Sequence, residues 1–213
     1  MTTRKRVGIL ISGRGSNMQA LIEACRAPDY PAEIAVVIAN RPGAPGLDRA
    51  REAGIATVTI DHKQFASREA FDEALDSALG GVGVDLVCNA GFMRILSAGF
   101  VEAWRDRHLN IHPSLLPAFR GLHTHEQAIA AGVCVSGATV HFVRAEMDAG
   151  PIVAQAVVPV EPDDTPDTLA ARVLTAEHRL YPHALRLVAS GAAWVEGEKV
   201  CLAPGAGPRA LFV

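Results

Sequence analysis

Along the first half of the chain, short apolar runs alternate with segments in which apolar residues recur every three or four positions. Uninterrupted apolar runs bounded by polar residues or glycine are typical of buried parallel strands. The strands predicted in this way are 7–11, 33–40, 57–60 and 85–89. The helical spacing predicts helices at 16–26, 46–53, 67–79 and 97–105. Repeated strand–helix units indicate right-handed crossovers, so we expect an α/β protein with a Rossmann-like, doubly wound, mainly parallel sheet.

The second half departs from this alternation. A short strand at 109–111 leads into a loop, and a helix follows at 124–131, where Thr124 and Gln127 have the spacing of a capping box. Two longer apolar runs, 135–144 and 151–160, are separated by six residues. They predict an antiparallel hairpin, so the sheet should become mixed here.

The last part of the chain begins with a long helix. Thr165 is its expected N-cap, and Pro182 lies inside it, where the missing amide donor should kink the helix. A terminal hairpin at 193–202 and a loose tail around 205–208 complete the chain. Neither repeats nor a linker interrupt the sequence.

We therefore expect one domain over 1–213 rather than several. Its N-terminal, nucleotide-binding half should cover about 1–105, and its C-terminal half about 106–190. The terminal hairpin and tail should occupy 191–213.

Composition narrows the class of protein. Among 213 residues, 20 Lys and Arg stand against 23 Asp and Glu, a net charge of −3, which argues against binding nucleic acid by bulk charge. No apolar run approaches the length of about 20 residues that a membrane-spanning helix needs. The basic N-terminus runs into an apolar stretch without a cleavage-type ending, so we expect a soluble cytoplasmic protein. Four scattered cysteines predict free, mostly buried thiols rather than disulfides.

The turn after the first predicted strand reads Ser12-Gly13-Arg14-Gly15-Ser16-Asn17. Glycines at the start of a helix let backbone amides approach an anion, so this turn is a candidate phosphate site. The alternative is an ordinary tight turn with Ser16 as the helix N-cap. The pattern lacks G-x-G-x-x-G, and Asn40-Arg41 stands where an acidic residue would follow the second strand, which argues against NAD.

Asn110 and His112 are two positions apart on an extended segment, so both side chains should point to the same side. An amide donor and an imidazole facing one point could polarise a carbonyl and stabilise an oxyanion. The alternative is a structural histidine at a strand end. Asp148 lies in the predicted hairpin turn. It either stabilises that turn, as acidic residues often do, or provides the carboxylate that orients His112, and the sequence leaves both roles open.

Five histidines suggest a possible metal site: His108, His112, His123, His125 and His141. His108 and His112 would share one face of a helix, but the strand character of the segment and Pro113 argue against a helix there. His123 and His125 could bind zinc together with Glu126, but no third ligand follows at a suitable spacing. We therefore expect no metal. Cys88 ends a buried strand and is expected to be a structural thiol rather than a nucleophile.

Five motifs occur in an order and spacing that resemble a known family. They are Gly13-x-Gly15-Ser16-Asn17, Ala90-Gly91-Phe92-Met93-Arg94-Ile95-Leu96, Asn110-Ile111-His112-Pro113-Ser114-Leu115-Leu116-Pro117, Gly121-x-His123-Thr124-His125 and Asp148-x-Gly150-Pro151. From about residue 7 to 187, the chain resembles the phosphoribosylglycinamide formyltransferases, folate-dependent transferases of purine biosynthesis.

The resemblance implies a reaction. The formyl group of the co-substrate 10-formyltetrahydrofolate would pass directly to the amine of glycinamide ribonucleotide, without a metal, in de novo purine biosynthesis. Both substrates are small molecules, so neither a nucleic acid nor a membrane partner is implied, and the protein should be a monomer or a homodimer.

The resemblance also implies site residues. The catalytic residues would be Asn110, His112 and Asp148. The ribonucleotide phosphate would be held by Gly15, Ser16 and Asn17, and its ribose by Glu177, which we expect to be exposed and fixed near Pro182. The folate would be bound by Arg68, Met93, Arg94, Ile95, Leu96 and Asn110. Arg14 and Ala149 depart from residues common in the family.

Three other functions compete with this one. Methionyl-tRNA formyltransferase has a similar catalytic domain but a further C-terminal tRNA-binding domain, for which the short C-terminal segment and the net charge of −3 leave no place. Formyltetrahydrofolate hydrolase has an additional N-terminal domain, whereas the first strand here begins at Val7. A non-catalytic nucleotide-binding module would leave Asn110, His112 and Asp148 without a role.

Overall fold

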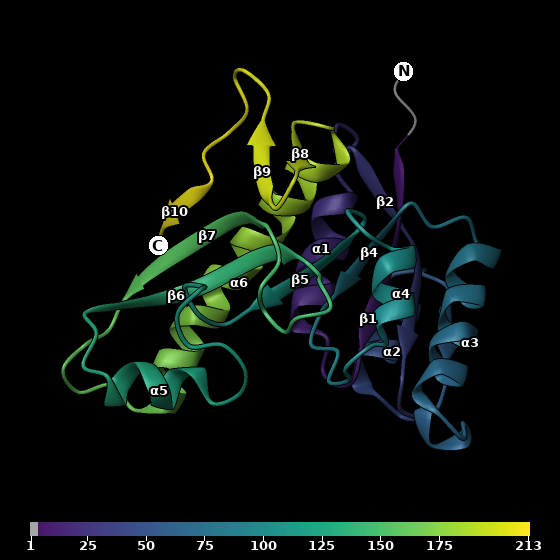
Figure 1. The fold of residues 1–213 in the computed structure, drawn as a ribbon, viewed down its shortest axis with the longest axis horizontal. Helices are drawn as coiled ribbons and strands as arrows, with labels where there is room; N and C mark the ends of the chain where they lie inside the picture. Colours follow the sequence, from purple (N-terminus) through teal and green to yellow (C-terminus); the bar gives the residue numbers. More distant parts are fainter. Residues whose placement is uncertain (1–3) are drawn as a thin grey trace. The chain divides into compact units, whose positions relative to one another are not determined.

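The computed structural model describes residues 4–213 and divides the chain into two compact units, one ending at Asn110 and the other beginning at Ile111 (Figure 1). The strands of the first unit are β1 (Lys5–Ile11), β2 (Ala32–Ala39), β3 (Thr57–Thr59), β4 (Leu86–Asn89) and β5 (His108–His112), whose last two residues belong to the second unit. Its helices are α1 (Ser16–Cys25), α2 (Pro45–Glu52), α3 (Arg68–Gly81), α4 (Ala98–Ala103) and the 3-10 helix η1 (His62–Gln64).

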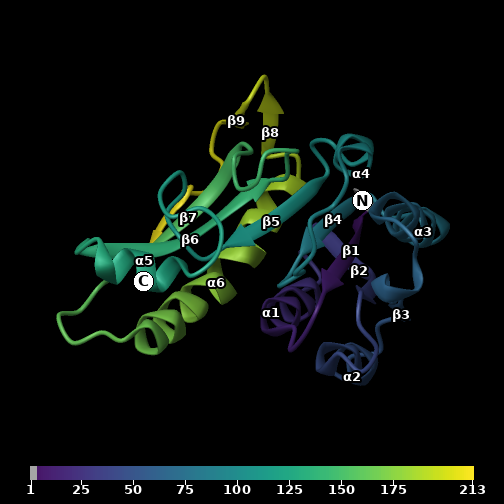
Figure 2. The ribbon, with the colours of Figure 1, turned by 60° about the horizontal axis from the view of Figure 1, so that its bottom comes forward.

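The sheet of the first unit is parallel, in the order β5-β4-β1-β2-β3. Every residue of β1 from Val7 to Ile11 is buried, because helices cover both faces of the sheet. Helices α1 and α2 lie on one side, and α3 and α4 lie on the other (Figure 2). Leu10 packs into an apolar cluster with Phe71 and Leu75 of α3 and Trp104 after α4. This arrangement confirms the predicted doubly wound α/β class.

The second unit has a mixed sheet. Its strands are β6 (Val135–Phe142), β7 (Ile152–Pro159), β8 (Ala193–Glu196), β9 (Lys199–Leu202) and β10 (Ala210–Phe212). Its helices are α5 (Thr124–Ala130) and α6 (Pro166–Ala189). Strands β6 and β7 form the predicted antiparallel hairpin, and α6 packs along both strands. Strands β8 and β9 form the predicted terminal hairpin.

The prediction of a loose tail is wrong beyond residue 208. Strand β10 pairs in parallel with β7, where the register places Leu211 beside Ala156. Arg209 fixes this strand, since its guanidinium donates to the carbonyls of Ile152 and Val153, the latter at 2.9 Å. Glycine and proline at 205–208 suggested disorder, but the hydrogen bonds of the next residues outweigh that local preference.

The helix ends agree in part with the sequence. Ser67 caps α3 as predicted, because its hydroxyl accepts from the amide of Ala70 at 3.1 Å. The predicted capping box at Thr124 is wrong. His123, in the left-handed region at φ 58°, is the N-cap of α5, and the side chain of Gln127 donates to the carbonyl of Leu122 at 2.7 Å. Among residues 4–213, no helix is both long and apolar enough to cross a membrane.

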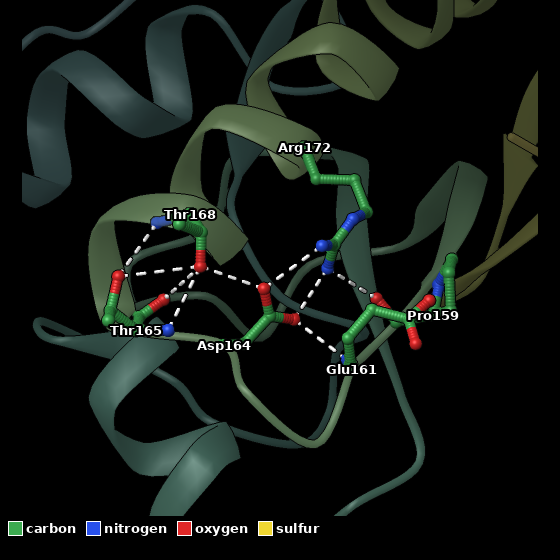
Figure 3. Close-up of polar contacts among 6 residues, drawn as sticks. All are labelled: Pro159, Glu161, Asp164, Thr165, Thr168 and Arg172. Carbon is green, nitrogen blue, oxygen red and sulfur yellow. Dashed lines mark hydrogen bonds and ion pairs between the residues drawn. The ribbon is translucent and has the colours of Figure 1, made fainter.

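A polar network fixes the start of α6 (Figure 3). The guanidinium of Arg172 donates to both carboxylate oxygens of Asp164, at 2.6 and 2.9 Å. The same carboxylate accepts from the amide of Glu161 and from the hydroxyl of Thr168, both at 2.8 Å. Thr165 and Thr168 exchange side-chain and backbone hydrogen bonds as a capping box, as expected of Thr165 as the N-cap. The hydrogen bonds and charge of Arg172 hold the pKa of Asp164 well below its ordinary value.

This network predicts an acid-sensitive start of α6. Because the pKa of Asp164 is lower in the folded protein, its contribution is complete above the unfolded pKa of about 3.9 and is lost as the pH falls further. We expect Asp164→Asn to lower the free energy of unfolding at pH 7, and the difference from wild type to shrink below about pH 4. Urea unfolding of both proteins at several pH values measures this. The matched control is Asp163→Asn, at the exposed neighbouring position; an equal effect of both substitutions would contradict the assignment.

Candidate functional site

The glycine turn after β1 ends in an open helix N-terminus. Gly15 is the N-cap of α1, at φ 69° in the left-handed region, and no side chain caps this end of the helix. Backbone hydrogen bonding of the helix begins where the amide of Gln19 donates to the carbonyl of Gly15 at 3.0 Å. The alternative of Ser16 as an N-cap is therefore wrong, since the cap lies one residue earlier. A helix N-terminus of this kind favours a bound anion.

This turn borders a surface hollow of about 310 Å³. The residues that line the hollow are 12–17, Arg41, Ala90, Gly91 and Met93. All of them follow the carboxyl ends of β1, β2 and β4, which is where ligands bind in open parallel sheets. Gly15, Ser16 and Asn17, the predicted phosphate ligands, are therefore brought together on one wall.

Hydrogen bonds made by the hydroxyl of Ser12 join three of these strand ends. The hydroxyl accepts from the amide of Met93 at 2.8 Å and donates to the side-chain oxygen of Asn40 at 2.7 Å. Asn40 is fully buried, and its backbone carbonyl accepts from Nδ1 of His62 at 2.8 Å. The segments that carry the phosphate turn, Arg41 and Met93 thus share one buried anchor.

The predicted folate segment exposes apolar side chains after β4. Met93 is 61% exposed and Ile95 is 59% exposed, whereas Leu96 packs against the core of the unit. Arg68 is the first residue of α3, and both Arg68 and Arg94 are exposed. Met93 and Ile95 therefore leave apolar surface accessible on either side of Arg94 in the chain.

Asn110 lies on β5 in direct register with Asn89 of β4. Two residues before Asn110 on β5, Nε2 of His108 donates to Oδ1 of Asn89 at 2.9 Å. His108 is 1% exposed and Asn89 is 8% exposed, so this is a buried polar pair beside the candidate catalytic amide. The alternation of an extended strand places His108, Asn110 and His112 on the same side of β5.

We expect the buried hydrogen bond between His108 and Asn89 to contribute to stability. Asn89→Leu removes the oxygen that accepts from the buried imidazole, and should lower the free energy of unfolding by about 1–3 kcal/mol. The double substitution Asn89→Leu/His108→Leu removes donor and acceptor together and should recover much of that loss. Urea unfolding of the two single variants and the double variant gives the coupling energy. Additive effects of the two substitutions would show that the pair is not coupled.

The second unit brings His112 and Asp148 together. Nδ1 of His112 lies 3.4 Å from Oδ2 of Asp148, and both side chains are buried to about nine-tenths or more. Nε2 of His112 donates to the carbonyl of Phe119 at 3.0 Å, and the amide of Gly121 donates to Oδ2 of Asp148 at 3.0 Å. Both ring nitrogens of His112 therefore face oxygen acceptors. Asp148 has φ 52°, so the turn that carries it is in the left-handed region.

His141 of β6 is a third member of this group, which the sequence had suggested only as one of several histidines that could bind a metal. Its Nε2 lies 3.8 Å from Oδ1 of Asp148, and its Nδ1 donates to the carbonyl of Phe142 at 3.0 Å. Burial lowers the pKa of His141, and this effect exceeds the opposing effects of the Phe142 carbonyl and of Asp148. Because a lowered pKa favours the neutral form of His141, His112 is the closer ionisable partner of the Asp148 carboxylate. The sequence could not show that His141 lies beside Asp148, because the strand pattern indicates burial but not which residues are in contact.

Glu177 corrects another expectation. It is only 7% exposed, because it lies on the packed face of α6 with Val173, Leu180 and Tyr181. The expected exposed carboxylate at this position is therefore wrong, although Glu177 is fixed by its burial.

The other groups considered from the sequence form no site of their own. Nδ1 of His123 lies 3.2 Å from Glu126 on the surface, so these two residues pair with each other. Within residues 4–213, no three His, Cys, Asp or Glu side chains are placed to hold a metal ion. All four cysteines are free thiols, two of them buried, and burial raises the pKa of Cys25 to about 12.

Comparison with known proteins adds independent information. A family described as formyl transferase matches residues 5–185. The phosphoribosylglycinamide formyltransferase of Escherichia coli (strain K12) is 47% identical over 199 residues, which cover 90% of this chain and 94% of that protein. A crystal structure of glycinamide ribonucleotide transformylase 1 from Symbiobacterium toebii has a TM-score of 0.92 and 49% identity, and the match covers 94% of this chain and 95% of that one.

A longer human relative also matches. The trifunctional purine biosynthetic protein adenosine-3 of Homo sapiens is 52% identical over 199 residues, or 93% of this chain. The match covers 20% of the human protein, so the chain spans about a fifth of the length of these trifunctional relatives.

Proposed function

Because the chain belongs to the formyl transferase family, we propose that it transfers the formyl group of 10-formyltetrahydrofolate to the amine of glycinamide ribonucleotide. The products are formylglycinamide ribonucleotide and tetrahydrofolate, and the reaction belongs to de novo purine biosynthesis. The observation that carries the proposal is the buried pair of His112 and Asp148, with Asn110 two positions earlier on the same strand. Related proteins with these names support the choice of substrates.

The reaction does not require a nucleophilic side chain, because the substrate amine is itself the nucleophile. The neutral amine attacks the formyl carbon, a carbon–nitrogen bond to the glycinamide forms, and the bond to the folate nitrogen breaks. Negative charge develops on the formyl oxygen, and positive charge develops on the attacking nitrogen. The side-chain amide of Asn110 donates to that oxygen and stabilises the charge.

His112 moves protons in this proposal. One proton leaves the attacking amine, and one reaches the departing folate nitrogen, directly or through water. Asp148 orients the imidazole, in the way that a carboxylate supports a histidine in other acyl-transfer sites. An acyl-enzyme is not needed, and Cys88, which is fully buried in a strand, is unsuited to form one.

Binding is assigned to the remaining predicted residues. Gly15, Ser16 and Asn17 receive the phosphate at the N-terminus of α1, and Glu177 accepts hydrogen bonds from the ribose hydroxyls. The folate is bound by Arg68, by residues 93–96 and by Asn110. We further propose that residues 1–213 act as one formyltransferase domain, as a monomer or a homodimer in the cytoplasm, on small-molecule substrates.

Three acceptors test the function with one donor. Purified protein and 10-formyltetrahydrofolate are incubated with glycinamide ribonucleotide, with methionyl-tRNA, or with water alone, and release of tetrahydrofolate is followed. We expect rapid release only with glycinamide ribonucleotide, unchanged after treatment with EDTA. Faster formylation of methionyl-tRNA, or equal release without an acceptor, would replace the proposal with a tRNA formyltransferase or a hydrolase.

A further inference from the structure

Two arginines without a side-chain partner lie beside the glycine turn, whereas the other arginines of this kind in residues 4–213, such as Arg49, lie elsewhere. Ion pairs hold arginines elsewhere, such as Arg51 to Asp48 at 2.6 Å and Arg6 to Glu33 at 2.9 Å. Among the residues that the structure describes, Arg14 and Arg41 have no hydrogen-bonding or ion-pair partner for their guanidinium groups. Both line the hollow at the carboxyl ends of the strands, and no acidic residue lines it with them.

The position of Arg41 is set by the buried residue before it. Asn40 is 0% exposed, and its side-chain oxygen accepts from Ser12 at 2.7 Å. The amide of Asn40 donates to the carbonyl of Ile11 at 3.3 Å, and its own carbonyl accepts from His62 at 2.8 Å. The chain therefore leaves β2 in a fixed place, and Arg41 is the first residue beyond that anchor.

The positive charge of this hollow suits an anionic ligand such as a phosphate group. A phosphate monoester carries a charge of about −1.5 to −2 at neutral pH. One guanidinium and the partial positive charge of about +0.5 at a helix N-terminus together reach only the lower end of that range. A second guanidinium, at the end of the neighbouring strand β2, lets the site neutralise the fully ionised phosphate as well, and charge-assisted bonds from arginine to phosphate are among the strong polar contacts of proteins.

We propose that Arg41 is a second cationic ligand of the ribonucleotide phosphate and makes the site selective for the phosphorylated ribose over the unphosphorylated one. This inference rests on the proposed function, because it assigns the phosphate of that substrate to the hollow. It adds a binding residue at the end of β2, in a segment that carries none of the residues assigned above.

The test uses Arg41→Gln, with Arg41→Lys to keep the charge. The matched control is Arg49→Gln, at an exposed arginine of α2 that borders a different hollow. Titration calorimetry measures binding of ribose 5-phosphate and of ribose, and steady-state kinetics measure KM for glycinamide ribonucleotide and for the folate. We expect Arg41→Gln to weaken ribose 5-phosphate and to raise KM for the ribonucleotide roughly tenfold, with less effect at high salt. Arg41→Lys should retain most of the affinity, and KM for the folate and kcat should stay within about twofold of wild type.

Two results would overturn the inference. One is unchanged affinity for ribose 5-phosphate in Arg41→Gln, and the other is an equal loss in Arg49→Gln, which would indicate a general effect of net charge. A different result would show that the proposed function is wrong. The wild type would then release no tetrahydrofolate with glycinamide ribonucleotide, while a drop in ribose 5-phosphate binding in Arg41→Gln would still support the phosphate ligand.

Discussion

Replacing His112 with alanine should lower kcat by about a hundredfold or more, while KM for either substrate changes far less. The imidazole acts on charge that develops only in the transition state, so its loss raises the barrier without weakening the ground-state complex. Steady-state kinetics with both substrates varied in turn measure the two effects separately. The matched control is His183→Ala, which removes a histidine whose Nε2 donates to the carbonyl of Pro208 at 2.7 Å, outside the proposed site.

Asp148→Asn tests whether the carboxylate charge is needed for the same catalytic step. The substitution keeps the shape of the side chain and removes its charge, which lies 3.4 Å from His112. We expect kcat to fall here as well, and the double variant with His112→Ala to lose little more than His112→Ala alone, because the two residues act as a unit. Near-normal turnover of His112→Ala in a folded protein, or additive losses in the double variant, would contradict the proposed mechanism.

Gly15→Val should raise KM for glycinamide ribonucleotide by about a hundredfold, with KM for the folate nearly unchanged. Gly15 adopts φ 69°, which a β-branched residue strongly disfavours. A Cβ at this position would lie 3.1 Å from Met18 and 3.3 Å from the backbone of Gly46. The turn would have to shift, and its amides would lose their approach to the phosphate. Calorimetric titration with each ligand separately measures the two affinities.

The chain offers a matched control for this backbone effect. Gly54 follows α2 at φ 78°, and nothing lies within 4 Å of the Cβ that a substitution would add. Gly54→Val therefore imposes a similar conformational cost away from the hollow, and it should lower stability without changing either KM. A parallel loss of ribonucleotide and folate binding in a folded Gly15→Val protein would place the phosphate elsewhere.

Local patterns in the sequence predicted the elements whose structure is set locally. The apolar run ending at Ile11 is a buried strand because both of its faces are covered, and Ser67 caps α3 because its hydroxyl lies within reach of the amide of Ala70. The glycine turn was also visible, since its conformation is a property of the glycines themselves.

Local patterns could not predict contacts between segments that are distant in the sequence. Asp148 and His112 stand far apart in the chain, and only the folded second unit brings their side chains to 3.4 Å. The burial of Glu177 and the place of His141 beside Asp148 depend in the same way on packing. Strand β10 forms because Arg209 bonds to carbonyls of β7, which outweighs a glycine- and proline-rich sequence before it.

The hydroxyl of Ser12 has a thermodynamic consequence. It bonds at once to Met93, in the proposed folate segment, and to Asn40, which anchors Arg41 at the proposed phosphate site. A ligand that orders one of these segments restricts the shared hydroxyl, and so reduces the conformational entropy that the other segment still has to lose. We therefore expect the two substrates to bind cooperatively. Because such coupling is reciprocal, the ribonucleotide should tighten folate binding by the same factor by which the folate tightens ribonucleotide binding.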